Sequence, residues 1–288
     1  LSVDVEDYFH VAAFDGAIDR KDWSGIQSRV VSNTHKVLDL FSLHKVKATF
    51  FVLGLVAEQH PELVKAIVDA GHELASHGYS HKKIYLQTQN EFRQETQRAK
   101  KLLEDISGQS VSGYRAASFS ITQKSLWALD ELVEAGFTYD SSVFPVHHDN
   151  YGIPGAQLDP HILTTPSGYQ IKELPLSSVG TRGLRIPVGG GGYFRLYPYW
   201  LTHKLLQRMN DQGRNFVFYC HPWEFDPQQP RIGNASRLSK FRHYNNLEKF
   251  VPRMERLIND FGLTTCSQVL ALSNLDSACN GAVAYPAG

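Results

Sequence analysis

Two histidines separated by three residues are the pair in this sequence best suited to metal chemistry. His77 and His81 lie in residues 75–81, directly after a short apolar stretch. Imidazole is the commonest protein ligand for divalent transition metals, and two rings with this spacing can face one ion from a helical turn or a tight loop. A chain with 13 histidines also produces this spacing by chance, so a metal site requires further ligands.

Three carboxylates near the start of the chain are the best candidates for those ligands. Asp4, Glu6 and Asp7 accompany a short apolar strand predicted over residues 1–5. Side chains alternate between the two faces of a strand, so Asp4 and Glu6 are expected on one face, and Asp7 joins them only if the strand has already ended. A solvated loop or a helix N-cap is the alternative interpretation of these acids.

Two further polar residues end predicted strands. Arg115 follows a strand predicted over residues 111–114, and its guanidinium could orient a carboxylate through a bidentate contact. A structural salt bridge is the alternative for Arg115. His221 ends the apolar strand predicted over residues 216–220, and packing gives a poor explanation for a histidine there. We therefore predict a functional role for His221.

Composition excludes several classes of function. The chain has 288 residues with 29 basic and 29 acidic side chains, so it has no broad charge footprint for nucleic acid. Its apolar runs are too short for a membrane span. Three widely spaced cysteines argue against a disulfide framework and indicate a reducing compartment. We expect a cytoplasmic protein, either free or close to a membrane, with a trimmed N-terminal signal as the open alternative; the oligomeric state is left open.

Strand-like and helix-like segments alternate along the chain, which predicts a mainly parallel sheet with helices outside. The candidate residues all lie at strand ends, where parallel α/β proteins place their active sites. Residues 146–170 are predicted as loop, and the glycine run 189–192 either lets backbone approach a ligand closely or forms a flexible loop. The remaining predicted strands are 46–53, 73–76 and 137–140. The first predicted helix carries Val37, Leu38 and Phe41 and is capped by Asn33 or Thr34. The other predicted helices are 61–70, a helix capped by Asn90 and ended by Gly108, 122–135, 198–212, 246–261 and a short one capped by Ser267.

In chain order, these segments resemble the polysaccharide deacetylases of carbohydrate esterase family 4. SVDVED, HGYSH, YRAAS and YCHP correspond to that family's Asp, H-x-x-x-H, Arg and late His motifs. Two departures are visible: Val5 separates Asp4 from Glu6 where the family has adjacent Asp residues, and Ala117 replaces a usual proline. The resemblance is closer to the subfamily associated with exosortase and exopolysaccharide gene clusters, through DVEDYF (4–9), ELASHGYSH (73–81), YDSSVFP (139–145), GGGGYFRLYP (189–198), CHPWEFDP (220–227) and FRHYNNLEKF (241–250).

The resemblance implies an α/β fold, a distorted and incomplete (β/α)7 barrel forming a single catalytic domain over residues 1–288. The tail 274–288 is expected to be loose. It also implies a divalent ion held by His77, His81 and either Glu6 or Asp7. Zn²⁺ suits this donor set best, with Co²⁺, Ni²⁺ or Mn²⁺ as alternatives.

By the same resemblance, Asp4 is the general base that deprotonates a metal-activated water, His221 is the general acid, and Arg115 holds Asp4 in place. The implied reaction removes N-acetyl groups from amino sugars of a bacterial polysaccharide or its precursor, as in exopolysaccharide biosynthesis. The alternatives are an amidase of the same fold acting on a small amide or cyclic ureide, and an inactive carbohydrate-binding relative. The residues expected to contact the sugar are Tyr193, Trp223, Tyr151 and Arg195.

Overall fold

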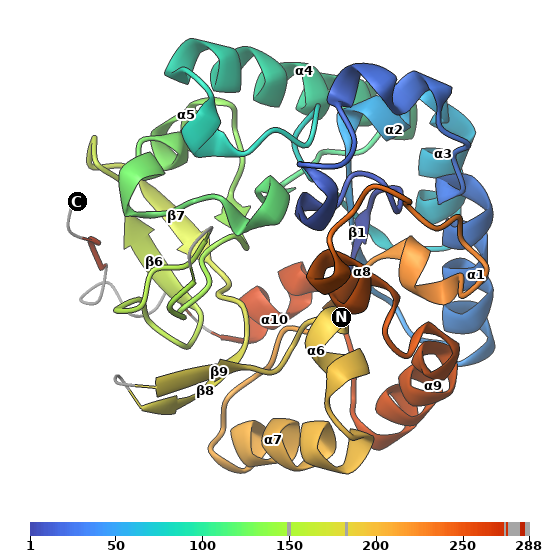
Figure 1. Cartoon of the computed structure of the whole chain (residues 1–288). Helices are drawn as coiled ribbons and strands as arrows, with labels where there is room; N and C mark the ends of the chain where they lie inside the picture. The colour runs from blue at the N-terminus through green and yellow to red at the C-terminus, as the bar shows by residue number, and fades with distance from the viewer. Residues whose placement is uncertain (149–150, 182–183, 274, 276–282, 286–288) are drawn as a thin grey trace.

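The computed structural model describes residues 1–148, 151–181, 184–273, 275 and 283–285. Within them, eight strands form one curled sheet in the order β10-β1-β2-β3-β4-β5-β7-β6, and every neighbouring pair is parallel except β6 with β7. A separate antiparallel hairpin joins β8 to β9 (Figure 1). The strands are β1 (Ser2–Val5), β2 (Thr49–Val52), β3 (Glu73–Ser76), β4 (Gly113–Tyr114), β5 (Tyr139–Asp140), β6 (His161–Thr164), β7 (Gln170–Glu173), β8 (Ser178–Thr181), β9 (Leu184–Pro187) and β10 (Tyr219–Cys220).

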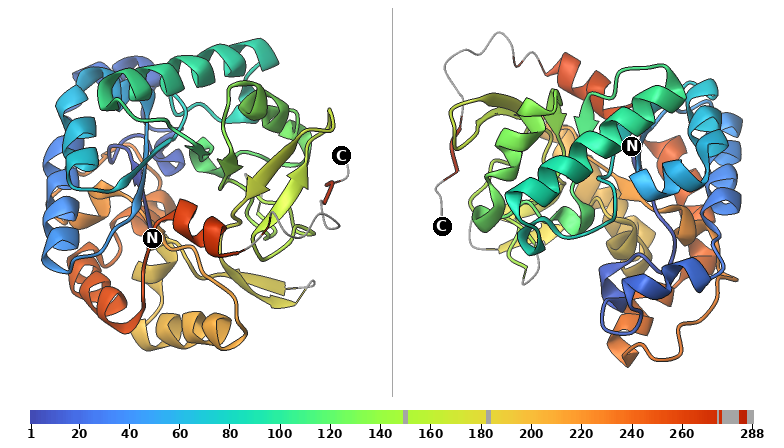
Figure 2. Two further views of the ribbon diagram at one scale, coloured as in Figure 1. Left: turned by 180° about the vertical axis from the view of Figure 1, so that it is seen from behind. Right: turned by 90° about the horizontal axis from the view of Figure 1, so that it is seen from above.

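Helices surround the curled sheet on its outside (Figure 2). Their bounds are α1 (Val30–Leu43), α2 (Gly54–Gln59), α3 (Pro61–Asp69), α4 (Gln89–Ser107), α5 (Ala128–Glu134), α6 (Gly191–Leu196), α7 (Tyr199–Asp211), α8 (Arg237–Tyr244), α9 (Phe250–Asp260) and α10 (Cys266–Leu272). None of the helices in the described ranges is both long and apolar enough to cross a lipid bilayer.

The strand register explains why a carboxylate lies inside the barrel. Asp4 pairs with Phe51 of β2, which in turn pairs with Ala75 of β3. Paired residues in a parallel sheet point to the same face, so Asp4 shares the interior face with Phe51 and Ala75. The alternate residues Val3 and Phe50 belong to the larger apolar cluster beneath the helices. Burial on both faces is typical of a parallel sheet, and it makes these strands read as continuous apolar runs.

The predicted alternation of strands and helices is correct in outline, but several helix starts were misplaced. The helix α1 begins at Val30, before the predicted cap, and α5 begins at Ala128, six residues after the predicted start. Thr88, not Asn90, caps α4: its hydroxyl accepts a hydrogen bond from the Glu91 amide, and the Glu91 carboxylate accepts one from the Thr88 amide. This reciprocal pair satisfies two main-chain donors that a single cap would leave open. Thr265, not Ser267, caps α10: its hydroxyl accepts a hydrogen bond from the Gln268 amide.

Three segments predicted as loop, tail or one helix differ in the structure. The predicted loop 146–170 contains β6, which pairs with β7 as an antiparallel edge. The predicted helix 246–261 begins as α-helix only at Phe250. Of the tail expected to be loose, 274, 276–282 and 286–288 lie outside the described residues. Val283, however, pairs with Leu163 of β6, so that short part of the tail is attached to the sheet edge.

Candidate active site

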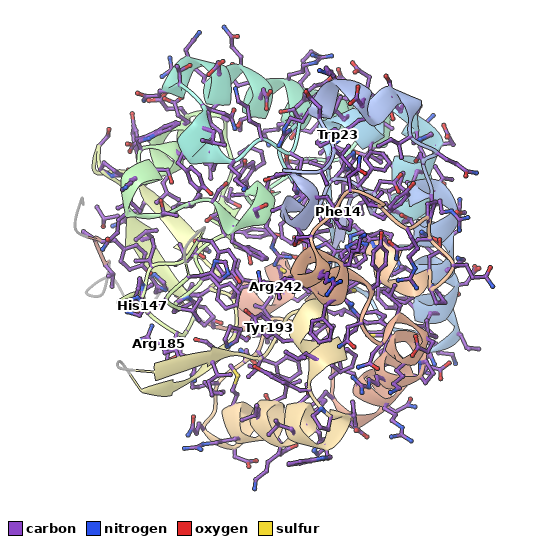
Figure 3. The ribbon with its side chains drawn as sticks, in the orientation of Figure 1. Phe14, Trp23, His147, Arg185, Tyr193 and Arg242 are labelled. Atoms are coloured by element: carbon purple, nitrogen blue, oxygen red, sulfur yellow. The ribbon has the colours of Figure 1, made fainter. Side chains whose placement is uncertain are left out.

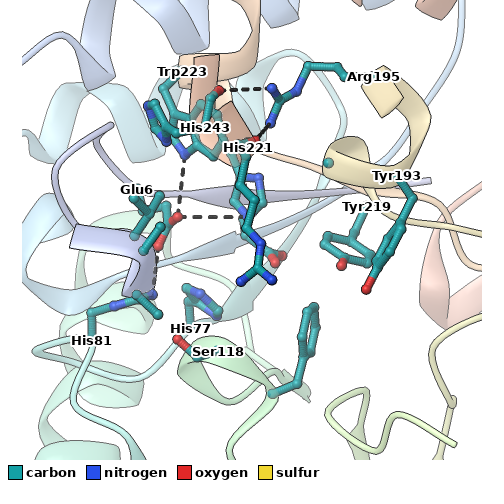
Figure 4. A pocket seen from close by; sticks show the side chains of 17 residues that line it. Glu6, His77, His81, Ser118, Tyr193, Arg195, Tyr219, His221, Trp223 and His243 are labelled. Atoms are coloured by element: carbon teal, nitrogen blue, oxygen red, sulfur yellow. Dashed lines mark hydrogen bonds and ion pairs between the residues drawn. The ribbon is translucent and has the colours of Figure 1, made fainter. Parts of the chain in front are cut away.

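Three side chains of the kinds that bind metal ions converge inside the sheet at the carboxyl ends of its strands. Glu6 follows β1, and His77 and His81 follow β3. One ligand atom from each residue lies within 4.8 Å of the others, and all three residues are buried (Figure 4). These two strands flank β2 in the sheet, so the order of strands brings together residues about seventy positions apart in sequence. The structure therefore brings together both histidines and one of the two alternative carboxylates.

The donor set fits a divalent cation. Glu6 Oε2 is buried and lies 2.6 Å from His81 Nε2, yet the two atoms do not have the geometry of a hydrogen bond. Two donor atoms that face one another in this way are suited to share an ion. Burial alone would raise the pKa of Glu6, but the charge and hydrogen-bonding potential of His81, with His221 and His77 beyond it, lower that pKa. Glu6 therefore presents a carboxylate anion to the site.

The ring of His77 is oriented by the main chain. Its Nδ1 lies 2.9 Å from the carbonyl oxygen of Arg115, which is an acceptor only, so Nδ1 carries the proton and Nε2 presents its lone pair. Burial lowers the pKa of His77 to about 4, and it does so against the opposing charge of Asp4. The ring is therefore neutral at physiological pH, as a metal ligand must be.

His81 lies in a strained turn that sequence reasoning did not anticipate. Its φ angle is +57°, a left-handed conformation that is uncommon for a residue with a side chain. Arg20 holds this turn by donating hydrogen bonds of 2.6 Å and 2.7 Å to the carbonyl oxygens of Ser80 and His81. Strain of this kind persists where surrounding contacts enforce it, and it is common at functional sites. No short sequence pattern links Arg20 to a turn sixty residues away.

Asp7 does not join the three ligand-type side chains. Its carboxylate accepts hydrogen bonds from the Ser28 hydroxyl and from the amides of Arg29 and Val30 at the start of α1. Burial raises the pKa of Asp7, although these hydrogen bonds oppose the shift. The helix-cap interpretation of this acid is the one that its contacts support, and Glu6 is the carboxylate that faces the two histidines.

Asp4 and Arg115 form a fully buried ion pair beside the three candidate metal ligands. Arg115 Nη1 lies 2.7 Å from Asp4 Oδ1 and 2.8 Å from the Ser2 hydroxyl. The other guanidinium nitrogens donate to the carbonyl and the hydroxyl of Ser141, and the guanidinium carbon lies 4.1 Å from the ring centre of Phe51. Because every side of the guanidinium is engaged, Asp4 is held in one position.

His221 lies across the site from His77 and is oriented by Glu224. Its Nδ1 lies 3.2 Å from Glu224 Oε2, and its Nε2 lies 3.7 Å from Glu6 Oε1. Burial would lower the pKa of His221, but the hydrogen bond and charge of Glu224 and the charge of Glu6 raise it to about 9. Sequence reasoning missed Glu224, although its position three residues after His221 is the spacing of a capping box, which the structure contains.

Arg195 was expected to contact a sugar, and its contacts show a different use. It is 2% exposed; its Nε donates to Glu224 at 2.8 Å, and its Nη1 donates to the carbonyl oxygens of His243 and Asn245. Its donors are therefore spent on the protein, and it serves to fix Glu224. A buried arginine between a carboxylate and several carbonyl oxygens is typical of a structural anchor.

The glycine run brings the backbone close to other side chains of the site. A β-carbon added at Gly191 would lie 2.0 Å from the Glu224 carboxylate, and one at Gly190 would lie 2.4 Å from the Tyr219 hydroxyl. The run starts α6 rather than forming a flexible loop. Of the two predicted interpretations, close approach is the one observed, although the group approached is a side chain of the protein.

The aromatic side chains expected to stack on sugars differ in their burial and in their position relative to the central cavity. Tyr193 is half-buried and lines the central cavity, which has a volume of about 220 Å³. Trp223 also lines this cavity, but it is only 5% exposed and stacks with the rings of His221 and His243 at 5.0 Å and 4.2 Å, so little of its ring is accessible. Tyr151 stacks with neighbouring rings outside the cavity lining and reaches Tyr193 only through their hydroxyls, 3.4 Å apart.

The cavity also includes residues that sequence reasoning did not select. Arg242 lies beside Tyr193 in the cavity lining, near the middle of the face drawn in Figure 3. Ser118 and Phe119 line the opposite wall with left-handed φ angles of 53° and 52°. The 3-10 helix of residues Ala12–Phe14 closes another side. These residues come from segments whose positions depend on tertiary packing.

Comparison with known proteins identifies relatives of this architecture. Residues 19–139 match the family model described as polysaccharide deacetylase, and residues 141–271 match a model described as a domain of unknown function, DUF3473. The chain is 29% identical over 148 residues to a peptidoglycan-N-acetylglucosamine deacetylase of Bacillus cereus. That match covers 47% of this chain and 52% of the relative, so the chain spans about half of the relative's length.

Two solved structures share the fold over nearly the whole chain. A candidate polysaccharide deacetylase of Mycobacterium smegmatis has a TM-score of 0.65 and 20% identity, covering 99% of this chain and 93% of the other. The PuuE allantoinase has a TM-score of 0.59 and 14% identity, covering 94% and 87%. This likeness confirms the predicted distorted (β/α)7 barrel. The family model over residues 19–139 and the curated relative show that part of this chain is similar to polysaccharide deacetylases, and the two solved structures show that the fold is shared over nearly its whole length.

Proposed function

We propose that this protein is a metal-dependent hydrolase that removes N-acetyl groups from amino sugars of a bacterial polysaccharide or its precursor. The observation that carries the proposal is the convergence of Glu6, His77 and His81 in one cavity with the Asp4–Arg115 ion pair and with His221. The name of the Bacillus cereus relative supports an N-acetylated glycan as substrate. The resemblance of residues 189–198, 220–227 and 241–250 to the subfamily associated with exopolysaccharide gene clusters supports a role in making such a polymer. The single large sheet supports one catalytic domain.

The site residues divide into an ion-holding group and a proton-handling group. Glu6, His77 and His81 would hold a divalent ion, for which Zn²⁺ suits two imidazoles and one carboxylate. When bound, such an ion supplies Lewis acidity and lowers the pKa of a coordinated water. Asp4 accepts the proton of the attacking water at its carboxylate. Arg115 holds that carboxylate in place, because its guanidinium is bonded on every side.

His221 donates a proton to the nitrogen of the departing amino sugar. The raised pKa of about 9 keeps the ring protonated at neutral pH, which a general acid requires. Glu224 accepts the hydrogen bond of Nδ1 and leaves Nε2 directed into the cavity. This division of a base and an acid between Asp4 and His221 also supports an active enzyme over an inactive carbohydrate-binding relative.

Acetate release from N-acetylated oligosaccharides of one to four sugars, with and without added Zn²⁺ or Co²⁺, tests the proposal. We expect metal-stimulated release from the native protein and none from His77→Ala. The matched control is His35→Ala, which changes an exposed histidine of α1. Hydrolysis of allantoin-like amides faster than that of the N-acetylated oligosaccharides would favour the alternative of an amidase. The fold shared with an allantoinase supports that alternative. Binding of oligosaccharides without turnover would favour the inactive binding protein.

A further inference from the structure

One stretch of the chain beside the cavity carries only positive charge. Residues 227–247 contain Arg231, Arg237, Lys240 and Arg242 and no acidic residue. Within the described residues, none of these four cations forms an ion pair with a carboxylate. Arg231, Arg237 and Arg242 are exposed, and Lys240 is half-exposed. An uncompensated cluster of this kind attracts an anionic surface, because its charges add over the distance of a Debye length.

The same stretch exposes large apolar side chains. Leu238 is 57% exposed and Phe241 is 53% exposed, and both belong to α8. Residues three apart in a helix lie on one face, so the two side chains form one apolar spot flanked by Arg237 and Lys240. The opposite face of α8 is anchored, because His243 is buried and stacks with Trp223. The helix therefore presents a mixed apolar and basic face to the outside.

The α8 helix is part of the rim of the cavity. His243 and Arg242 line the cavity, and the ring of Phe14 from the 3-10 helix Ala12–Phe14 packs 4.7 Å from that of His243. Figure 2 shows α8 and the segment around residues 12–25 projecting together from one side of the barrel. A surface that contacted α8 would consequently lie next to the opening through which a substrate reaches Glu6 and the histidines.

We propose that α8 docks this protein on an anionic lipid membrane, with Leu238 and Phe241 in the headgroup region. Exposed apolar side chains on a helix gain free energy on entering that region, and basic residues beside them attract anionic lipid. Binding of a polyanionic glycan would explain the four cations but would not explain the exposure of Leu238 and Phe241. The membrane interpretation uses both features, and it does not depend on the proposed reaction.

Co-sedimentation of the full chain with lipid vesicles tests this docking directly. We expect binding to vesicles of phosphatidylcholine with about one-third phosphatidylglycerol, and on the order of tenfold weaker binding to pure phosphatidylcholine. The double variants Leu238→Asp/Phe241→Asp and Arg237→Glu/Lys240→Glu should each lose about tenfold or more in partition coefficient. Both should retain the native circular dichroism spectrum, because Arg237, Leu238 and Phe241 are exposed and, among the described residues, the half-exposed Lys240 side chain forms only one hydrogen bond, to the Gly233 carbonyl oxygen.

Matched control variants distinguish binding through α8 from nonspecific binding of the protein surface to vesicles. Leu43→Asp removes an apolar side chain that is 74% exposed at the end of α1, and Lys65→Glu reverses an exposed charge on α3. We expect both controls to bind the anionic vesicles as the native protein does. Equal binding of the α8 variants and the controls would overturn the proposal. So would binding of a soluble anionic polysaccharide in place of vesicles, which would make the rim a glycan site.

Discussion

One hydrogen bond joins the ring of His77 to the main chain of Arg115, with His77 Nδ1 2.9 Å from the arginine carbonyl oxygen. The side chain of the same arginine holds the Asp4 carboxylate at 2.7 Å. A proposed metal ligand and the proposed base therefore take their orientation from a single residue at the end of β4. A shift of this strand end would displace both groups together, so their relative position is fixed even where the surrounding loops move.

Glu6→Gln and Asp7→Asn are expected to have different effects on metal content. Glu6 faces His77 and His81, so Glu6→Gln should reduce bound Zn²⁺ strongly, because an amide is a much weaker ligand. Asp7 caps α1, so Asp7→Asn should retain the metal and lower the free energy of unfolding by about 1 kcal/mol. Elemental analysis and urea unfolding measure the two effects. Loss of metal in Asp7→Asn alone would reverse the assignment.

Asp4→Asn should slow acetate release by roughly 10²–10⁴-fold while leaving metal content unchanged. The rate should fall because the amide cannot accept the proton of the attacking water. The metal content should not change because the candidate metal ligands are other side chains. Steady-state rates with added Zn²⁺ and elemental analysis of the same preparation provide the measurement. The roles would be misassigned if this variant lost its metal but regained activity at saturating Zn²⁺.

The buried carboxyl pair Asp140 and Glu173 should make stability depend on pH. Burial raises the pKa of Asp140 to about 6, and burial with the charge of Asp140 raises the pKa of Glu173 well above its usual range. Both groups bind protons more tightly in the folded protein than in the unfolded chain. Their stabilisation is therefore complete below about pH 4 and is lost as the pH rises through 6 and beyond.

Urea unfolding of the native protein and of Glu173→Gln at several pH values between 4 and 8 checks this dependence. The native protein should lose stability over this range more steeply than the variant, because the amide keeps the hydrogen bond to Val143 without a titrating proton. The Glu62→Gln variant changes an exposed acid of α3 and serves as the control. Parallel stability curves for the native protein and Glu173→Gln would contradict the prediction.

Tyr193→Ala should lower kcat/KM more for a tetrasaccharide than for a monosaccharide. Tyr193 lines the cavity and keeps part of its ring accessible, so it can stack on a sugar beyond the reacting unit. Trp223→Ala should instead lower stability by about 3–5 kcal/mol, because its buried ring packs against two histidines. Kinetics across chain lengths and thermal unfolding distinguish the two residues. An equal effect of Tyr193→Ala on both substrates would exclude the stacking role.

The sequence was most informative where local rules decide the structure. The alternation of faces along β1 and the positions of strand ends predicted that Asp4, Glu6, His77, Arg115 and His221 would meet, because parallel strands bring their carboxyl ends to one edge. These predictions need only the periodicity of a strand and the topology of a parallel sheet.

The remaining features depend on contacts between distant segments. Arg195 and Trp223 have residue types suited to sugar binding, and both border the cavity, but contacts with the protein bury nearly all of their surface. Arg20 supports the turn at His81 although it lies about sixty residues earlier in the sequence. Glu224 orients His221 from three residues away, a spacing that also occurs in ordinary helix caps. The antiparallel strand β6 lay in a segment rich in turn-forming residues, whose edge pairing no local pattern specifies.

The place of β1 between β2 and β10 has a consequence for how the protein folds. The Ser2 hydroxyl bonds to the Phe218 carbonyl, 216 positions later in sequence. Such a contact has a very high sequence separation, so the closing of this pair is expected to be slow. During synthesis the ribosome must deliver the 216 positions from Ser2 to Phe218 before β1 gains its second neighbour, and His221 reaches Glu6 only then. The nascent chain therefore exposes an unpaired apolar edge throughout that stage, when a chaperone would have the most to protect.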